Sequence, residues 1–395
     1  MSTPASRRRR IVLLAHDVHD RGGMERAFAE LVRRGSGEVE FAVVARTLAE
    51  DLRPLVDWTR VRVPARPAPL RFALYWLLAG RSLRRLRRGG DVVHALGAIV
   101  PDRVDVASVH HCHRGSLDVM GLTPAGAPVL RRLNTAVARI LALAAERWCY
   151  RPSRVRVLAA VSEGTRAEVE RFYPGVPSVL TPNGVDTSRF RPDPARRAEL
   201  RRDLGVPGES VVALFVGGNW DLKGLRVAIE ATALAGRRVP GLELWVLGRG
   251  DAARFGRVAA AAGAAEAVRF LGEVDEPSSF YASADVFVLP SLYETFSLVA
   301  YEAAASGLPV LATSVNGVRE IVGADDGGRL LERTPAAFAE ALEHFAEDRD
   351  ARARAGDRAR ERAAAFTWER GVGAVLDVYR SLGEQIDAAA GAVAA

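Results

Sequence analysis

The sequence predicts an α/β protein built from two parallel-sheet units, and three observations support this class. The stretch 285–312 contains a buried strand, a polar turn, a helix and a second apolar run, which is the unit that builds parallel sheets. Two further stretches, 11–34 and 211–236, run from an apolar strand through a glycine turn into a helix. A chain of 395 residues, 49% of them hydrophobic, is also long enough to bury two cores.

Composition narrows the class of protein further. No apolar run reaches the length needed to span a bilayer. The basic start, Arg7 to Arg10, is followed by an apolar region, Ile11 to Ala15, that is too short for a signal peptide. The two cysteines, Cys112 and Cys149, make no disulfide framework. Together these features predict a cytoplasmic protein.

Charge is distributed unevenly along the chain. Residues 1–190 hold 31 arginines and 18 acidic residues, a net charge of +13, whereas the remainder holds 24 basic and 30 acidic residues, a net charge of −6. Such asymmetry favours contact of the first half with an anionic surface, although a general bias toward arginine would also produce it. Lys223 is the only lysine among 55 basic residues, which suggests that its position needs a compact ammonium group.

The first half contains a regular series of elements. Strands are predicted at 11–15, 41–45, 61–63, 92–95, 104–109 and 155–161, and helices at 27–34, 70–88, 129–150 and 165–172. Gly22 and Gly23 stand between the first strand and the first helix, where glycine allows a phosphate to approach the backbone closely. The competing interpretation of this Gly-Gly pair is an ordinary turn.

The second half repeats the pattern. Strands are predicted at 211–216, 244–247, 268–272, 286–289 and 310–312, and helices at 225–236, 278–283, 298–305, 335–365 and 367–382. Glycine loops follow two of these strands, at 217–224 and at Gly248-Arg249-Gly250. The predicted boundaries are 1–180 for the first domain, 181–365 for the second, 366–385 for a C-terminal helix and 386–395 for a disordered Ala/Gly tail.

Two carboxylates eight residues apart make the stretch described first a candidate site. Glu294 lies in the loop after the strand, and Glu302 lies about one and a half turns into the helix. Ser297 occupies the N-cap position, and the amides of Phe296, Ser297 and Leu298 with the helix dipole favour an anion such as phosphate. Carboxylates beside a phosphate are placed to accept hydrogen bonds from a ribose or a sugar. The competing interpretation is one solvated glutamate and one loop glutamate.

This stretch resembles a known family. The pattern Glu294-x7-Glu302, between Asp285-Val-Phe-Val-Leu-Pro-Ser and Ser306-Gly-Leu-Pro-Val, is similar to the signature of retaining glycosyltransferase family 4. The resemblance extends over roughly residues 10 to 382 and is closer in the second half. It implies the GT-B fold, with two Rossmann-like domains facing across a cleft. It also implies transfer of a sugar, with retention, from a UDP- or GDP-sugar to an acceptor hydroxyl, with no metal and no other cofactor.

The resemblance implies roles for individual residues. Glu294 would contact the donor sugar, Glu302 the ribose, and Lys223 the diphosphate leaving group. The segment ending in His110 resembles one that places a histidine near the donor sugar, so the catalytic candidates are His110, Lys223 and Glu294. In the family, the last helix crosses back onto the first domain.

The nucleotide-binding candidates are mainly glycines and helix-start amides: Gly22, Gly23, Gly218, Gly248, Arg249, Phe296, Ser297, Leu298 and Glu302. Arg249 is interpreted as a phosphate ligand, with a plain turn as the equal alternative for its loop. The sequence departs from the family at Gly218, where an arginine usually precedes the lysine by five residues. One diphosphate contact is therefore missing or comes from elsewhere.

Residues 71–88 combine an apolar, aromatic front with arginines at 71, 81, 84, 85, 87 and 88. This pattern is typical of an interfacial helix, in which each arginine near an anionic leaflet adds roughly 1 kcal/mol. The alternative is a core helix with a solvated basic end. The membrane interpretation predicts peripheral binding to an anionic surface and a lipid-linked or cell-envelope acceptor; a small secondary metabolite is the alternative acceptor.

Other functions fit less well. The ligand types in His110-His-Cys-His113 are adjacent and cannot readily converge on one metal ion. The first loop lacks the G-x-G-x-x-G of NAD enzymes. A phosphorylase needs a cofactor lysine, and Lys223 already has a role, whereas a GT-B epimerase would keep the nucleotide loops. Aromatic residues are not arrayed for nucleic-acid binding. A non-catalytic nucleotide-sugar binder is the main rival, because of Gly218.

Overall fold

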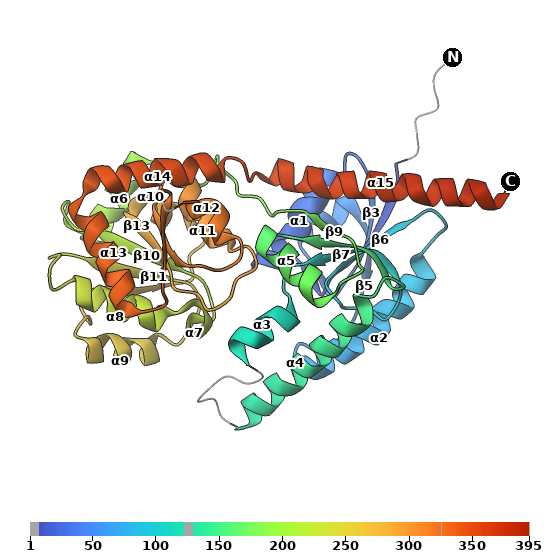
Figure 1. The fold of residues 1–395 in the computed structure, drawn as a ribbon, viewed down its shortest axis with the longest axis horizontal. Helices are drawn as coiled ribbons and strands as arrows, with labels where there is room; N and C mark the ends of the chain where they lie inside the picture. Colours follow the sequence, from blue (N-terminus) through green and yellow to red (C-terminus); the bar gives the residue numbers. More distant parts are fainter. Residues whose placement is uncertain (1–7, 122–128, 325, 395) are drawn as a thin grey trace, which may run out of the picture. The chain divides into compact units, whose positions relative to one another are not determined.

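The computed structural model describes residues 8–121, 129–324 and 326–394. The chain forms two compact units: unit 1 comprises residues 1–183 and 368–395, and unit 2 comprises residues 184–367. Each unit is a parallel sheet with helices packed on it (Figure 1). The prediction of an α/β chain with two Rossmann-like units is confirmed.

Unit 1 contains a seven-stranded sheet in the order β5-β3-β1-β6-β7-β8-β9, with every neighbouring pair parallel. Its strands are β1 (Arg10–Leu14), β3 (Glu40–Ala45), β5 (Val56–Arg60), β6 (Val92–Leu96), β7 (Val104–Val109), β8 (Val155–Ala160) and β9 (Ser178–Leu180), with a separate short pair, β2 (Asp17–Val18) and β4 (Thr47–Leu48). Its helices are α1 (Gly23–Gly35), η1 (Glu50–Leu55), α2 (Ala68–Leu86), α3 (His113–Met120), α4 (Val129–Cys149), α5 (Glu163–Phe172) and α15 (Trp368–Ala394).

Strand β1 shows how unit 1 buries both faces of its sheet. Successive side chains on a strand point to opposite faces. Ile11 and Leu13 accordingly pack in a core with α1 and α15, whereas Val12 and Leu14 pack in a second core with α2. The continuous apolar run that predicted this strand is therefore explained by burial on both sides.

Unit 2 contains a six-stranded parallel sheet in the order β12-β11-β10-β13-β14-β15. Its strands are β10 (Val212–Val216), β11 (Glu243–Leu247), β12 (Val268–Gly272), β13 (Val286–Leu289), β14 (Val310–Thr313) and β15 (Gly328–Leu331). Its helices are α6 (Pro194–Asp203), α7 (Trp220–Lys223), α8 (Leu225–Ala235), α9 (Ala252–Ala262), α10 (Ser278–Ser283), α11 (Leu298–Ala305), α12 (Val318–Val322), α13 (Pro335–Glu347) and α14 (Arg349–Ala363). Helices α8, α9 and α13 share one core with the sheet.

Two predicted elements differ from the structure. The strand expected at 61–63 is β5, five residues earlier; β5 is an edge strand whose side chains are half-buried or exposed, so it lacks the apolar run of an inner strand. The tail predicted to be disordered continues α15 as far as Ala394. Ile386 packs against the core of unit 1 and Asp387 pairs with Arg9, and the alanines that follow are strong helix formers.

No helix in the described part of the chain is long and apolar enough to cross a membrane.

Candidate functional site

The sheet of unit 2 changes direction between β10 and β13. From β10 the chain moves outward to β11 and β12, and it then returns to place β13 on the other side of β10. The two central strands are parallel, with Ala213 opposite Val286 and Leu214 opposite Phe287, so the loops that follow them leave the same edge. In open parallel sheets, ligands bind in the crevice at this switch point.

The glycines of the β10 and β11 loops allow backbone to lie against backbone. A Cβ on Gly248, which has a φ of 109°, would lie 2.4 Å from the carbonyl oxygen of Gly217. A Cβ on Gly224, with a φ of 80°, would lie 2.0 Å from the carbonyl oxygen of Pro290 in the β13 loop. These positions exclude any side chain, and they hold the three loops together at the switch point.

Lys223 and Glu294 meet at this edge. The Lys223 ammonium lies 2.6 Å from Oε1 of Glu294, and the Ser291 hydroxyl donates to the same oxygen at 2.7 Å. Lys223 ends the short helix α7, and the amide of Leu292 donates to the carbonyl of Leu222, which fixes the β13 loop beside that helix. Both charged side chains are largely buried, so the sheet edge holds one cation and one carboxylate in a fixed arrangement.

The start of α11 is strained and incompletely bonded. Ser297 has φ 66° and ψ 69°, a left-handed conformation that costs a non-glycine residue on the order of 1 kcal/mol. Ser297 occupies the N-cap position, as predicted, but its side chain makes no capping bond, because a capping serine needs an extended backbone. Its buried hydroxyl has no hydrogen-bond partner among the described residues.

A buried hydroxyl without a partner costs about 1–3 kcal/mol. The first amides of any helix also lack acceptors within the helix. The amides of Phe296, Ser297 and Leu298 belong to this helix start. A strained backbone, a hydroxyl without a partner in the described part of the chain, and helix-start amides at one point are therefore the features expected where an anionic ligand binds.

Neighbouring aromatic side chains hold α11 in place. Phe296 stacks on Tyr301 with ring centroids 4.0 Å apart, and the Tyr301 hydroxyl donates to the carbonyl of Gly317 at 2.8 Å. The carboxylate of Glu302 is buried and accepts a hydrogen bond from the Tyr281 hydroxyl at 3.0 Å. Sequence reasoning found Glu302 but missed Tyr281, because nothing in the spacing links the two helices that carry them.

Arg249 lies on the surface of unit 2. Its guanidinium forms two hydrogen bonds with Glu273, at 2.8 and 3.1 Å, and its side chain is 76% exposed. Its carbonyl oxygen lies 3.8 Å from where a Cβ on Gly218 would stand. The loop is thus beside the β10 loop, while the guanidinium is engaged by a carboxylate.

Unit 1 has a corresponding switch point between β1 and β6. Gly22, with a φ of 91°, precedes the first turn of α1, and Gly23 begins that helix. The carboxylate of Glu25 lies so close that a Cβ on Gly22 would be 2.5 Å from its Oε2. The start of α1 therefore already faces a carboxylate from its own first turn.

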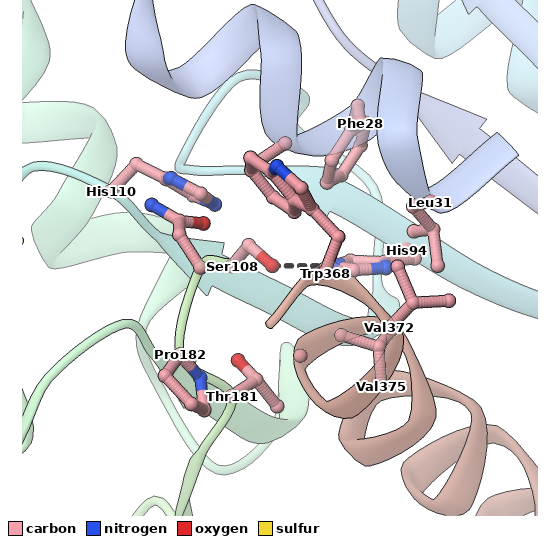
Figure 2. A pocket seen from close by; sticks show the side chains of 13 residues that line it. Phe28, Leu31, His94, Ser108, His110, Thr181, Pro182, Trp368, Val372 and Val375 are labelled. Carbon is pink, nitrogen blue, oxygen red and sulfur yellow. Dashed lines mark hydrogen bonds between the residues drawn. The ribbon is translucent and has the colours of Figure 1, made fainter. Parts of the chain in front are cut away.

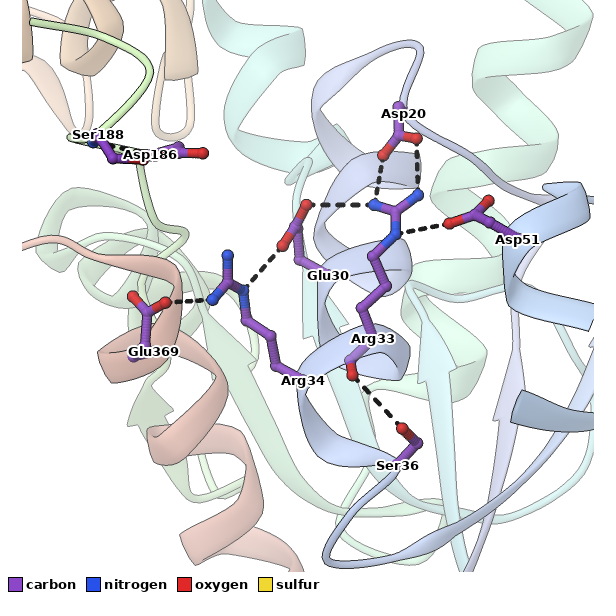
Figure 3. Close-up of polar contacts among 9 residues, drawn as sticks. All are labelled: Asp20, Glu30, Arg33, Arg34, Ser36, Asp51, Asp186, Ser188 and Glu369. Atoms are coloured by element: carbon purple, nitrogen blue, oxygen red, sulfur yellow. Dashed lines mark hydrogen bonds and ion pairs between the residues drawn. The ribbon is translucent and has the colours of Figure 1, made fainter. Parts of the chain in front are cut away.

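Ion pairs fix the loop before α1, as Figure 3 shows. Arg33 near the end of α1 forms two hydrogen bonds with Asp20, at 2.6 and 2.7 Å, and a third with Asp51 at 2.8 Å. The hydrogen bonds from Arg33 hold the pKa of Asp20 below its usual value. Arg34 pairs with Glu30 and with Glu369 of α15, so the same helix face also anchors the C-terminal helix.

His110 follows β7 and lines a small pocket between the sheet, α1 and α15 (Figure 2). Burial lowers the pKa of His110 to about 4, so its imidazole is neutral at pH 7. Two residues earlier, Ser108 lies 2.7 Å from Nε2 of His94, whose Nδ1 lies 2.5 Å from the Tyr379 hydroxyl of α15. Burial, and secondarily His110, lower the pKa of His94 to about 3.

The Tyr379–His94–Ser108 chain links the C-terminal helix to the strand that carries His110. Sequence reasoning missed it, because its members are separated by as many as 285 residues. The indole nitrogen of Trp368, in the same pocket, has no hydrogen-bond partner among the described residues.

The other members of the histidine-rich segment have structural contacts. The backbone amide of Gly115 donates to the Cys112 thiol at the start of α3, and His111 lies 3.1 Å from the Ser116 hydroxyl. Within the described ranges, no group of three or more His, Cys, Asp or Glu side chains is arranged to hold a metal ion.

Comparison with known proteins assigns the family. Residues 21–189 match the family described as Glycosyltransferase Family 4, and residues 196–362 match Glycosyl transferases group 1. The D-inositol 3-phosphate glycosyltransferase of Kineococcus radiotolerans is 32% identical over 413 residues, which cover 91% of each chain. That of Geodermatophilus obscurus is 30% identical, over 94% of this chain and 87% of the relative. This chain is a family 4 glycosyltransferase.

Solved structures agree on the fold. WaaG, a glycosyltransferase involved in lipopolysaccharide biosynthesis, superposes with a TM-score of 0.77 at 20% identity and covers 95% of this chain and 99% of its own. The complex of Anabaena HepE with UDP-glucose has a TM-score of 0.70 at 17% identity and covers 96% of this chain and 99% of its own. The predicted family and GT-B fold class are therefore confirmed.

In this glycosyltransferase, most of the predicted site residues that the structure brings together lie in unit 2. Lys223, Glu294 and the start of α11 come together at one switch point, and Gly248 packs on the loop that contains Gly218. His110, Gly22 and Gly23 lie in unit 1, and the guanidinium of Arg249 is bound to Glu273. The roles of these residues toward a donor stay predictions.

Proposed function

We propose that this glycosyltransferase transfers a sugar from a nucleotide diphosphate sugar, with UDP as the favoured nucleotide, to an acceptor hydroxyl with retention of anomeric configuration. One observation carries the proposal: an ammonium–carboxylate pair lies beside a strained helix start whose buried serine hydroxyl has no partner within the described ranges. A diphosphate needs positive charge and amide donors, whereas a sugar offers hydroxyls to a carboxylate. This edge of unit 2 has groups suited to both.

The reaction breaks the bond between the anomeric carbon and the diphosphate oxygen and forms a bond from that carbon to the acceptor oxygen. The acceptor proton passes to the leaving diphosphate, which attack on the same face would permit. Charge develops on the diphosphate in the transition state, so Lys223 and the amides at Ser297 are proposed to stabilise it. Glu294 would orient the sugar hydroxyls, Glu302 the ribose, and neutral His110 would act near the anomeric carbon.

One finding on another protein and one feature of this chain support the choice of donor and the absence of a metal from the proposed reaction. Anabaena HepE, similar in fold, is known in complex with UDP-glucose. In the glycosyltransferase described here, the ammonium of Lys223 and the amides of α11 supply the charge that a metal ion supplies elsewhere. We therefore propose metal-independent transfer, which unchanged turnover in excess EDTA would support.

The donor is tested by thermal denaturation with UDP-, GDP- and ADP-sugars, because a ligand that binds the folded state raises its apparent stability. We expect a UDP-sugar to raise the melting temperature of the wild type and not that of Lys223→Ala. Arg237→Gln, which removes the same charge at an exposed arginine of unit 2 outside the candidate site, is the control. No shift with any nucleotide sugar at millimolar concentration would contradict the proposal. NMR of the product then gives the anomeric configuration.

Two classes of acceptor follow from different observations. The relatives that align over most of the chain are named D-inositol 3-phosphate glycosyltransferases, which favours a phosphorylated cyclitol. The basic, apolar segment 71–88 favours a lipid-linked or cell-envelope glycan. Turnover with inositol 3-phosphate and with a lipid-linked sugar, each at fixed donor concentration, separates the two. Donor hydrolysis without transfer to either would reject both.

A further inference from the structure

Exposed apolar side chains gather on two helices of unit 1. Among the described residues, twelve large hydrophobic side chains are exposed, and nine of them belong to α2 or α4. These nine are Leu70, Leu77 and Leu78 on α2, and Val129, Leu130, Leu133, Val137, Ile140 and Trp148 on α4. The two helices pack against each other and run side by side in Figure 1. Clusters of this kind mark interaction surfaces rather than ordinary solvent-facing helices.

On α4 the exposed apolar residues form one stripe. Leu130, Leu133, Val137 and Ile140 follow one another at intervals of three or four residues, which places them on one face of the helix. Their exposed fractions are 79%, 59%, 39% and 54%. With Trp148 the stripe is roughly 27 Å long at about 1.5 Å per residue.

The opposite face of α4 packs against the rest of unit 1. Ala142, Ala145 and Cys149 are buried against the rest of unit 1. A surface helix normally turns its polar side outward once its apolar side is buried. Helix α4 instead exposes a second apolar face, which its fold within unit 1 does not need.

The sequence around this surface contains many more basic than acidic residues. No acidic residue occurs between Asp57 and Asp91, a stretch that holds nine arginines, and none occurs between Asp118 and Glu146. On α2, Arg81 and Arg85 continue the exposed side that begins with Leu77 and Leu78, and both are exposed. At the end of the α4 stripe, the guanidinium of Arg154 stacks 4.3 Å from the Trp148 ring. Exposed apolar side chains flanked by arginines are complementary to an anionic lipid surface.

We propose that α2 and α4 form a membrane-docking face, with the α4 stripe inserted at the headgroup boundary of an anionic bilayer and the α2 arginines against its phosphates. The sequence prediction covered only residues 71–88, because the Ala/Leu composition of α4 is also that of a buried core helix. A second copy of the chain is the other possible occupant. It fits less well, because the helices hold eight arginines and one glutamate, and a symmetric contact would bring like charges together.

The test is sedimentation of the full-length protein with vesicles, which measures binding without turnover and so does not depend on the proposed reaction. We expect binding to vesicles of phosphatidylglycerol and phosphatidylcholine at low salt, and weak or no binding to phosphatidylcholine alone. Raising the salt to about 0.5 M weakens the arginine contribution. Absence of binding to the anionic vesicles at low salt would overturn the proposal.

Leu133→Ser and Ile140→Ser remove two side chains of the stripe. Each is expected to weaken binding roughly tenfold, because each removes one aliphatic side chain that would otherwise pass partly from water into the bilayer. Leu55→Ser is the matched control, because Leu55 is 40% exposed on η1 of the same unit, away from the stripe. An equal loss in the control would overturn the assignment of the face.

Arg85→Gln tests the charge and leaves the apolar stripe intact. It is expected to weaken vesicle binding about fivefold, the effect of one arginine near an anionic surface. Arg237→Gln, the same change at an exposed arginine of unit 2, is expected to have no effect. Light scattering without lipid completes the test: a dimer that Leu133→Ser dissociates, with no change in vesicle binding, would assign the face to a second copy instead.

Discussion

The two units have the same arrangement of parallel strands and glycine loops, but they differ in the side chains at the point where the strand order reverses. In each, a parallel sheet reverses its strand order, and glycine loops follow the strands at that point. Unit 2 places a lysine, two glutamates and an incompletely bonded helix start there. Unit 1 holds six of the seven histidines of the chain, and the loop at its switch point is fixed by ion pairs between Arg33 and the carboxylates of Asp20 and Asp51. The comparison shows that the Lys223–Glu294 ion pair belongs to unit 2, whereas most of the histidines belong to unit 1.

The difference has a physical basis in burial. In unit 1, desolvation lowers the pKa of five histidines, to about 3 or 4: His16, His94, His110, His111 and His113. In unit 2, the largely buried side chains of Lys223 and Glu294 form an ion pair, in which each offsets the cost of burying the other. The buried histidines of unit 1 are therefore neutral at pH 7, whereas the lysine and the glutamate at the switch point of unit 2 are paired.

Glu294→Gln gives the sharpest test of the charge in unit 2. The amide keeps the size of the side chain, but it removes the charge that pairs with Lys223 and weakens acceptance from sugar hydroxyls. We expect kcat to fall about 100-fold or more, the loss typical of one group that stabilises a transition state. The melting temperature should fall, because the largely buried ammonium of Lys223 loses its counter-charge, but the protein should remain folded. Near-normal turnover would contradict the role given to this carboxylate, and Glu273→Gln, on the same unit, is the control.

Acid is expected to destabilise unit 1 more than unit 2. The five histidines have folded pKa values below the unfolded value of 6.5, so the unfolded state binds more protons between about pH 4 and 6.5. Their contribution is complete above pH 6.5 and is lost as pH falls toward 4, on the order of 1 kcal/mol per pKa unit for each group. Glu146 opposes this trend, because burial raises its pKa to about 7.

Hydrogen exchange at pH 7 and pH 5 measures the stability of the two units separately, through the protection of their backbone amides. We expect amides of the unit 1 sheet to lose protection at pH 5 while those of the unit 2 sheet keep theirs. His94→Gln should reduce the dependence on pH, since it removes one of the depressed groups. Equal loss of protection in both sheets would contradict the assignment of acid sensitivity to unit 1.

The sequence predicted the features that depend on residues close together in the chain, and it missed those that depend on distant residues. The strand, loop and helix around Glu294 were predictable, because apolar runs and glycines carry that information within about 25 residues. Ser297 was placed correctly at the helix start, but its left-handed backbone was not predictable, since it depends on how Phe296 packs against Gly317. The Tyr379–His94–Ser108 chain and the exposed face of α4 depend on tertiary packing, which no local pattern encodes.

Tyr379→Phe tests the buried chain in unit 1. The change leaves Nδ1 of His94 buried without its partner, and we expect unfolding to become easier by about 1–2 kcal/mol. Calorimetry should show the lower melting temperature, and NMR of the imidazole nitrogens should show a changed His94 signal. Tyr75→Phe is the matched control, because Tyr75 is equally buried in unit 1 and donates only to backbone carbonyls. The same His94 signal in both variants would contradict the linkage.

Gly218→Arg tests whether the glycine loop of unit 2 binds the diphosphate, and it has the smallest expected effect of these changes. A Cβ at Gly218 would meet its nearest atom at 3.8 Å, so an arginine can be accommodated, and it would add a second cation to the loop of Lys223. We expect tighter binding of UDP, by roughly tenfold for one charge-assisted contact, measured by calorimetric titration. Gly248→Ala is the contrasting change, because its Cβ would lie 2.4 Å from the carbonyl of Gly217 and should destabilise unit 2. Unchanged UDP affinity in Gly218→Arg would mean that the diphosphate does not lie over this loop.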